Sequence, residues 1–170
     1  MGHCIQCNTV RGNMIGRRLT EEEAHAVLKV ARSRVAEPGE VIFRRGEDSD
    51  GCYLVLTGQI EISQNGHMLA TLDAPTVIGE MSLLTAQKRS ATAKAVPKSE
   101  LLHIPKAEFT AMLDSENISA LKVVRSFAEI ICDRLRAMDE RLSTAANAKP
   151  EALLDDLARV KKSLFSDWAF

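Results

Sequence analysis

The stretch from residue 41 to residue 104 constrains the fold most, because it breaks into short strand-like segments separated by turn signals. Ile60 and Ile62 alternate with polar neighbours, which is typical of a strand with one buried face. The dipeptide Asn65-Gly66 then favours a two-residue hairpin turn. Short strands that recur roughly every 8–12 residues, with turns between them, predict an antiparallel barrel or sandwich.

Helical patterns flank this strand region. Thr20 and Glu23 have the spacing of a capping box, and the helix that they begin is expected to end near Arg32. A short helix is expected over residues 106–113 and a long one over residues 117–146. Seven apolar residues of the long helix alternate in steps of three and four, as in a coiled-coil seam: Leu121, Val124, Ala128, Ile131, Leu135, Met138 and Leu142.

These patterns predict an α+β protein, namely an antiparallel β-roll (a jelly-roll-like barrel) flanked by an N-terminal helix and C-terminal helices. We expect an irregular segment over residues 1–18, one domain over residues 19–146 that includes the long helix, and a C-terminal amphipathic helix over residues 150–168. The seam leaves two alternatives open: the long helix joins a homodimer as a coiled coil, or it packs entirely on its own roll. The last helix, which carries Trp168, either forms a lid over a ligand or packs on the domain or on a partner.

The composition is that of an ordinary globular protein, with 170 residues, 45% hydrophobic and 26% charged residues, and a net charge of -1. This balance does not predict a surface for non-specific nucleic-acid binding. No apolar run reaches the roughly 18–20 residues of a membrane helix, and the N-terminus lacks the pattern of a secretory signal. We therefore expect a soluble cytoplasmic protein. Cys4 and Cys7 form a single Cys-x-x-Cys pair without a second ligand pair, so no metal site is expected.

The stretch from residue 78 to residue 92 carries the candidate chemistry. Gly79 allows a close approach of the backbone, and the helix start that follows offers unpaired N–H groups. Glu80 can accept a hydrogen bond from a hydroxyl, and Arg89 can bind phosphate oxygens through its forked guanidinium. With the Ser90 hydroxyl beside the arginine, these groups are suited to an anionic sugar ligand.

The order of these features resembles the cyclic nucleotide-binding domain family, over about residues 35–142. The landmarks that carry the resemblance are Gly39, Gly46 with Glu47, Gly58, and the cassette Gly79-Glu80 followed by Arg89-Ser90-Ala91-Thr92. The departures are Ile78, where many relatives have Phe, and Pro75-Thr76, where many have Gly-Asp.

The resemblance implies a role for each matching residue. Glu80 would bind the ribose 2′-hydroxyl, and Arg89 would bind the exocyclic oxygens of the cyclic phosphate. Main-chain N–H groups near Met81 and Ser82, with the Ser90 hydroxyl, would add contacts. Apolar residues would form the pocket wall, namely Leu72, Val77, Ile78 and Leu83, with Ala91 beside the arginine.

The choice of base depends on two regions. Ser90 after the arginine favours cyclic AMP over cyclic GMP, because family members that prefer guanosine often have Thr there. In bacterial relatives, polar residues of the long helix meet the adenine. On that basis Arg136 would stack on the base and Asp139 would accept from its amino group.

We therefore expect a non-enzymatic receptor for cyclic AMP, or failing that cyclic GMP, with no other cofactor. About 28 residues follow Leu142, too few for a helix-turn-helix domain, so we expect no direct DNA binding and signalling in trans to another protein chain. One alternative is a degenerate domain that acts as a dimeric assembly module, with Glu80 and Arg89 as an internal ion pair. Another is a cupin-type metalloenzyme, which would need clustered histidine ligands that the chain does not offer.

Overall fold

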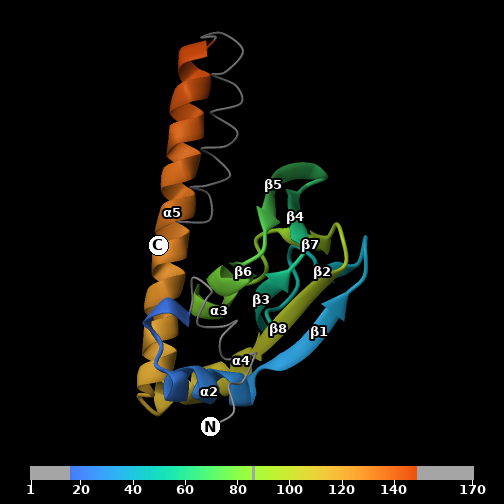
Figure 1. The fold of residues 1–170 in the computed structure, drawn as a ribbon. Coiled ribbons are helices and arrows are strands. Elements are labelled where there is room, and N and C mark those ends of the chain that lie inside the picture. The colour runs from blue at the N-terminus through green and yellow to red at the C-terminus, as the bar shows by residue number, and fades with distance from the viewer. Residues whose placement is uncertain (1–15, 86, 149–170) are drawn as a thin grey trace. The chain divides into compact units, whose positions relative to one another are not determined.

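The computed structural model describes residues 16–85 and 87–148. It divides after Phe127 into two compact units. The elements in chain order (Figure 1) are η1 (Gly16–Arg18), α2 (Glu21–Val30), β1 (Arg32–Ala36), β2 (Val41–Phe43), β3 (Gly51–Thr57), β4 (Gln59–Gln64), β5 (His67–Asp73), β6 (Thr76–Ile78), α3 (Glu80–Thr85), β7 (Thr92–Ala95), β8 (Ser99–Pro105), α4 (Lys106–Asp114) and α5 (Ile118–Ala148).

Within the described residues, eight strands form two four-stranded sheets. One sheet has the order β1-β8-β3-β6 and the other the order β2-β7-β4-β5, and every pairing is antiparallel. The β4–β5 hairpin turns at Asn65 and Gly66, whose φ angles of 52° and 80° are the positive values that a two-residue turn of this kind requires. The predicted fold class, an antiparallel β-roll with flanking helices and a long C-terminal helix, is confirmed.

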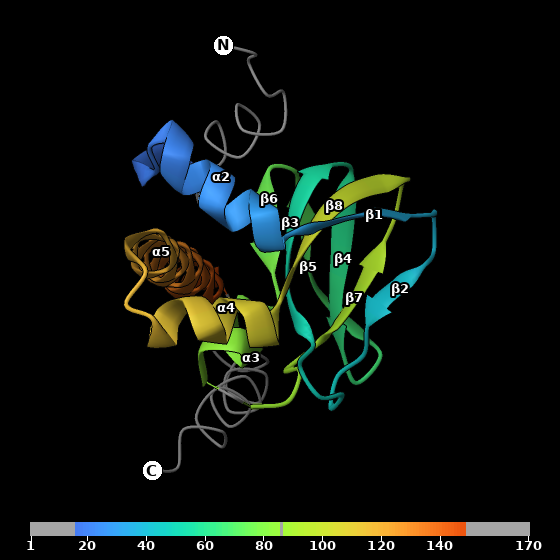
Figure 2. The same cartoon turned by 90° about the horizontal axis from the view of Figure 1, so that it is seen from below.

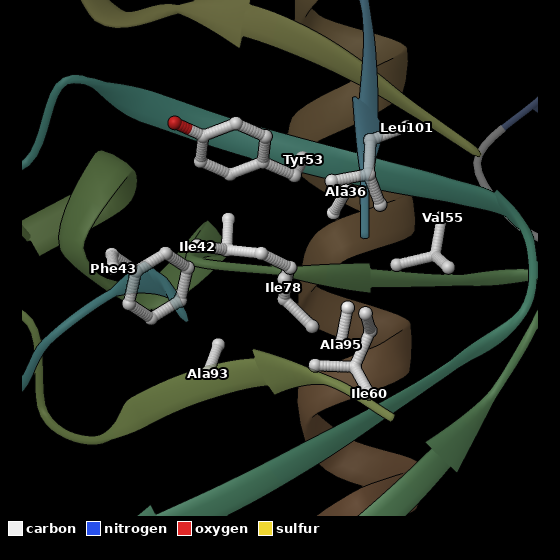
Figure 3. Packing of buried hydrophobic residues seen from close by; sticks show 10 residues of the cluster. All are labelled: Ala36, Ile42, Phe43, Tyr53, Val55, Ile60, Ile78, Ala93, Ala95 and Leu101. Carbon is white, nitrogen blue, oxygen red and sulfur yellow. The ribbon is translucent and has the colours of Figure 1, made fainter. Parts of the chain in front are cut away.

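The hydrophobic core of the roll lies between the two sheets (Figure 3). Tyr53, Val55 and Leu101 come from one sheet, and Ile60 and Ala95 come from the other. Ile60 is fully buried, as its alternation with polar neighbours predicts. Ala36, Ala93 and Ala95 are fully buried in the same cluster, and this packing holds the strands that carry the candidate site.

The N-terminal helix α2 begins at the predicted capping box. The Oγ1 atom of Thr20 accepts from the Glu23 main-chain N–H at 3.2 Å, and the Thr20 N–H donates to the Glu23 carboxylate at 2.7 Å. Glu23 also pairs with Lys122 Nζ at 2.6 Å, which fastens α2 to the first turns of α5. Figures 1 and 2 show α2 and α4 on the same side of the roll.

The long helix α5 begins at Ile118, one residue later than predicted. Its first turn is capped by Asn117, whose Oδ1 accepts from the main-chain N–H groups of Ser119 at 2.9 Å and Ala120 at 3.4 Å. Val123 and Phe127 are fully buried, and Leu121 of the predicted seam is 48% exposed. None of the described helices is both long and apolar enough to cross a membrane.

Three local predictions were wrong or incomplete. The first helix ends at Val30, close to the predicted end near Arg32, but Arg32 begins β1, a strand the sequence did not indicate. That strand is polar and mostly exposed, so its pairing with β8 decides its conformation. Strand β6 has only three residues and was also missed, and residues 16–18 form a 3-10 turn where irregular chain was expected. The predicted helix over residues 150–168 and the pair Cys4 and Cys7 lie outside the described residues.

Candidate functional site

Gly79 makes the sharp junction between β6 and α3. Its φ angle is +77°, a conformation that side chains with a Cβ rarely adopt. A Cβ atom added there would also collide with the guanidinium of Arg89. Glycine is therefore required twice at this position, once for the backbone and once for the arginine that lies against it.

Arg89 is buried, with 3% of its surface exposed. Its Nη1 donates to the Gly79 carbonyl at 3.1 Å and to Ser82 Oγ at 2.8 Å, and its Nη2 donates to Asp50 Oδ1 at 2.5 Å. The guanidinium carbon lies 4.1 Å from the centre of the Phe43 ring, a cation–π distance. The Nε atom is buried and has no hydrogen-bond partner among the described residues.

The loop of Arg89 is tied by main-chain bonds to the acidic loop before β3. The Arg89 N–H donates to the Glu47 carbonyl at 2.9 Å, and the Gly46 N–H donates to the Arg89 carbonyl at 2.8 Å. Two segments more than 40 residues apart in sequence are thereby held side by side. This pairing places the Arg89 side chain within reach of Asp50.

Asp50 shares its carboxylate among several groups. Oδ1 accepts from Arg89, and Oδ2 accepts from the Tyr53 hydroxyl at 2.7 Å and lies 3.4 Å from His103 Nε2. Partial burial alone would raise the pKa of Asp50, but the Tyr53 hydrogen bond and the charges of His103 and Arg89 outweigh it and lower the pKa. Burial, with the hydrogen bond to Asp50 second, raises the pKa of Tyr53 to about 12. Asp50 is therefore ionised and Tyr53 neutral at neutral pH.

Helix α3 supplies the next part of the site. Glu80 is its first residue and is 3% exposed, so a carboxylate is buried at the start of a helix. Ser82 is also buried, and its Oγ lies 3.2 Å from both Ser49 Oγ and the Gly79 carbonyl. Leu83 is buried, whereas Met81 is 46% exposed. The side chain of Ser82 thus helps to hold Arg89, in addition to the main-chain role that was predicted near it.

The remaining predicted residues are distributed more widely. Ser90 is exposed, and its carbonyl accepts from Gln64 Nε2 at 3.2 Å, while Ala91 is half-buried. Ile78 is part of the core between the sheets, and Leu72 packs against the same core.

The structure thus brings Gly79, Glu80, Ser82, Leu83 and Arg89 together on and beside α3. Arg136 and Asp139 belong to the second compact unit, where Arg136 Nη1 pairs with Asp133 Oδ1 at 2.8 Å. Their contact with a base stays a prediction.

Sequence reasoning missed Asp50, Tyr53, His103 and Phe43 as neighbours of Arg89. The acid-rich loop over residues 46–51 was the one available signal for Asp50. The ion pair that the structure shows for Arg89 is with Asp50. In the described parts of the chain, no three His, Cys, Asp or Glu side chains form a group that could hold a metal ion.

Residues 33–116 match the family model of the cyclic nucleotide-binding domain. The cyclic AMP receptor protein of Thermus thermophilus is 30% identical over 139 residues, which cover 78% of this chain and 62% of the receptor. The relatives compared are longer proteins, of which the chain spans between 6% and 62%.

Solved structures show the same fold. The Thermus thermophilus catabolite activator protein superposes with a TM-score of 0.65 at 29% identity, over 79% of this chain and 63% of that one. A cyclic nucleotide-binding domain from Methylobacillus flagellatus superposes with a TM-score of 0.70 at 20% identity, over 80% and 79% of the two chains. Through residues 33–116, the chain therefore belongs to the cyclic nucleotide-binding domain family.

Proposed function

We propose that this chain is a non-enzymatic receptor that binds cyclic AMP through Gly79, Glu80 and the segment Arg89–Ala91. One observation carries the proposal: a buried guanidinium lies beside the first turn of α3, and its Nε has no hydrogen-bond partner among the described residues. A buried cation with an unused donor is suited to an anion. The similarity to a protein named as a cyclic AMP receptor supports the same ligand.

In this proposal the cyclic phosphate binds to Arg89 and to the N–H groups at the start of α3, and the ribose 2′-hydroxyl donates to Glu80. Each charge-assisted hydrogen bond contributes about 1.5–3 kcal/mol. A ligand of about 22 non-hydrogen atoms gains about 0.3–0.4 kcal/mol per atom, so we expect a Kd in the micromolar range. Ser90, with Arg136 and Asp139 of the long helix, would select adenine over guanine.

Ligand binding would be transmitted through α5. This helix follows α4 closely, and the pair Glu23–Lys122 joins its first turns to α2. The ligand would shift α5 only to the extent that it binds one position of the helix more tightly than another. The exposure of Leu121 and Leu135, at 48% and 49%, supports a homodimer through the seam. Signalling in trans to a further protein stays part of the proposal.

Calorimetry with cyclic AMP and cyclic GMP tests the ligand. We expect cyclic AMP to bind in the micromolar range and Arg89→Gln to weaken it at least about a hundredfold, since two charge-assisted bonds would be lost. Lys88→Gln is the matched control, because Lys88 is the neighbouring cation, with its side chain 67% exposed. Thermal unfolding of both variants separates lost binding from lost folding.

A second function is favoured by the ion pair between Arg89 and Asp50, because that pair compensates the buried cation without any ligand. The domain would then be an assembly module that binds no nucleotide. No heat with either nucleotide at millimolar concentration, and an Arg89→Gln variant that behaves like the parent, would reject the receptor and leave the assembly module as the remaining hypothesis.

A further inference from the structure

The Asp50 carboxylate lies between the candidate ligand-binding arginine and an imidazole. Oδ1 accepts from Arg89, whereas Oδ2 lies 3.4 Å from Nε2 of His103. This Nε2 is buried and has no hydrogen-bond partner of normal geometry among the described residues. A proton on Nε2 would therefore point a charged donor at the carboxylate that holds Arg89.

The position of His103 is fixed by the sheet. Strand β8 runs between β1 and β3, and His103 is paired in register with Arg32 on one side and Tyr53 on the other. The His103 and Tyr53 rings stack with centroids 4.6 Å apart and an interplanar angle of 18°. The imidazole therefore cannot turn away easily when its charge changes, and a change in its charge acts on Asp50.

Among the charged groups near His103, Asp50 is the anion that faces the imidazole. The cations nearby are Arg32 and Arg34 of β1, and each is paired elsewhere. Arg32 Nη2 lies 2.8 Å from Glu108 of α4, and Arg34 Nη2 lies 2.8 Å from Glu40. Burial lowers the pKa of His103, and the two arginines act in the same direction, while Asp50 opposes them. His103 of the ligand-free protein is thus neutral at neutral pH, and acid is needed to charge it.

We propose that His103 is a positioning residue whose protonation draws Asp50 away from Arg89 and so frees the guanidinium for an anionic ligand. This inference rests on the proposed function and adds a regulation of the same site. A phosphodiester bound at Arg89 replaces Asp50 as the partner of the guanidinium. The carboxylate is then free to pair with the imidazolium.

Because both the bound anion and the released carboxylate favour the charged imidazole, ligand binding raises the pKa of His103 and takes up a proton. Ligand affinity must then increase as the pH falls through the histidine range. For each unit by which the ligand raises the pKa of His103, the affinity for the ligand is about tenfold higher at the acidic limit than at the alkaline limit. A phosphodiester keeps its single charge over this range, so the ligand itself contributes no proton.

Calorimetry of cyclic AMP at about pH 6, in buffers of different ionisation heat, counts the protons taken up with the ligand. We expect a fractional uptake in the parent and none in His103→Gln, which keeps a polar side chain but cannot titrate. The matched control is His67→Gln, since His67 lies exposed on the β4–β5 hairpin. Affinity measured from about pH 5.5 to 8 should rise several-fold toward acid in the parent and in His67→Gln only.

Binding without proton uptake in the parent, or equal uptake in His103→Gln, would overturn this inference and leave the receptor intact. Absence of any binding heat with cyclic AMP and cyclic GMP would instead overturn the proposed function and this inference with it. A merely structural role of His103 would lower affinity equally at every pH, so the pH profile separates that role from positioning.

Discussion

Arg89 Nη2 lies 2.5 Å from Asp50 Oδ1, so the central cation of the candidate site already has an anionic partner inside the protein. The arginine side chain is 1% exposed, whereas that of the aspartate is 56% exposed. A ligand that reaches Arg89 therefore competes with a carboxylate that is itself partly in contact with solvent.

Asp50→Asn should strengthen the binding of cyclic AMP several-fold and lower the free energy of unfolding by about 1–3 kcal/mol. The amide keeps an oxygen for Tyr53 or Arg89 but removes the charge that repels a phosphate, and it leaves a buried guanidinium less well compensated. Calorimetry and urea unfolding measure the two effects. Asp48→Asn, with a side chain 90% exposed, should change neither. Weaker binding in Asp50→Asn would mean that the carboxylate mainly positions Arg89.

Gly79→Ala should abolish nucleotide binding and destabilise the protein, because a methyl group there strains the backbone and displaces the Arg89 guanidinium. Gly66→Ala separates the two causes, since Gly66 has a similar φ of +80° but open space around its added Cβ. It should cost only about 1–2 kcal/mol of backbone strain and leave binding unchanged. If both variants bind like the parent, Arg89 is not the ligand-binding group.

Leu135→Asp should convert a dimer into a monomer and leave the roll folded, because Leu135 lies on the predicted seam and is 49% exposed in the single chain. Ala137→Asp introduces the same charge two residues away, off the seam, and should leave the mass unchanged. Light scattering coupled to size exclusion measures the mass, and far-UV circular dichroism reports the fold. A parent that is monomeric at high concentration would refute the coiled-coil prediction.

The stability of the ligand-free protein should fall as the pH drops below about 6.5. The pKa of His103 is lowered in the folded protein, so the unfolded chain binds the proton more readily and acid favours unfolding. The stability that neutral His103 contributes is complete above the pKa of this histidine in the unfolded chain. It is lost as the pH falls through the pKa of His103 in the folded protein. Urea unfolding of the parent and of His103→Gln across this range should give a smaller pH dependence in the variant. If the free energy of unfolding depends on pH equally in the parent and in His103→Gln, groups other than His103 determine that dependence.

The parts of the site that are local in sequence could be predicted, and the parts that depend on strand pairing could not. Gly79, Glu80 and Ser82 are nearly consecutive, and Arg89 follows within a few residues, so a short pattern contains them. His103 reaches the site only because β3 and β8 pair with Tyr53 opposite His103. No spacing within the sequence specifies that register.

The limits on predicting the fold have similar causes. The hairpin at Asn65 and Gly66 and the capping box at Thr20 are chemical signals of a few adjacent residues, and both were predicted. Strand β1 shows no hydrophobic alternation that could have predicted it. It lies at the edge of its sheet, where pairing with β8 holds it in place. In α5 the heptad pattern identified Leu121, whereas Val123 and Phe127 form the buried stripe beside it. Two apolar stripes on one helix cannot be assigned to their partners by periodicity alone.

The main-chain bonds that join Arg89 to Gly46 and Glu47 have a consequence for how this domain can diversify. The acidic loop can change its residue types where they face solvent, as at Asp48, without moving the arginine. A change in its length between Gly46 and Asp50 would act differently, because each inserted or deleted residue would shift the carboxylate along the chain by more than 3 Å relative to the guanidinium. In the proposed receptor, loop length would therefore set how strongly Asp50 competes with the ligand for Arg89, and a variant with a longer or shorter loop would differ in affinity even with an identical cassette.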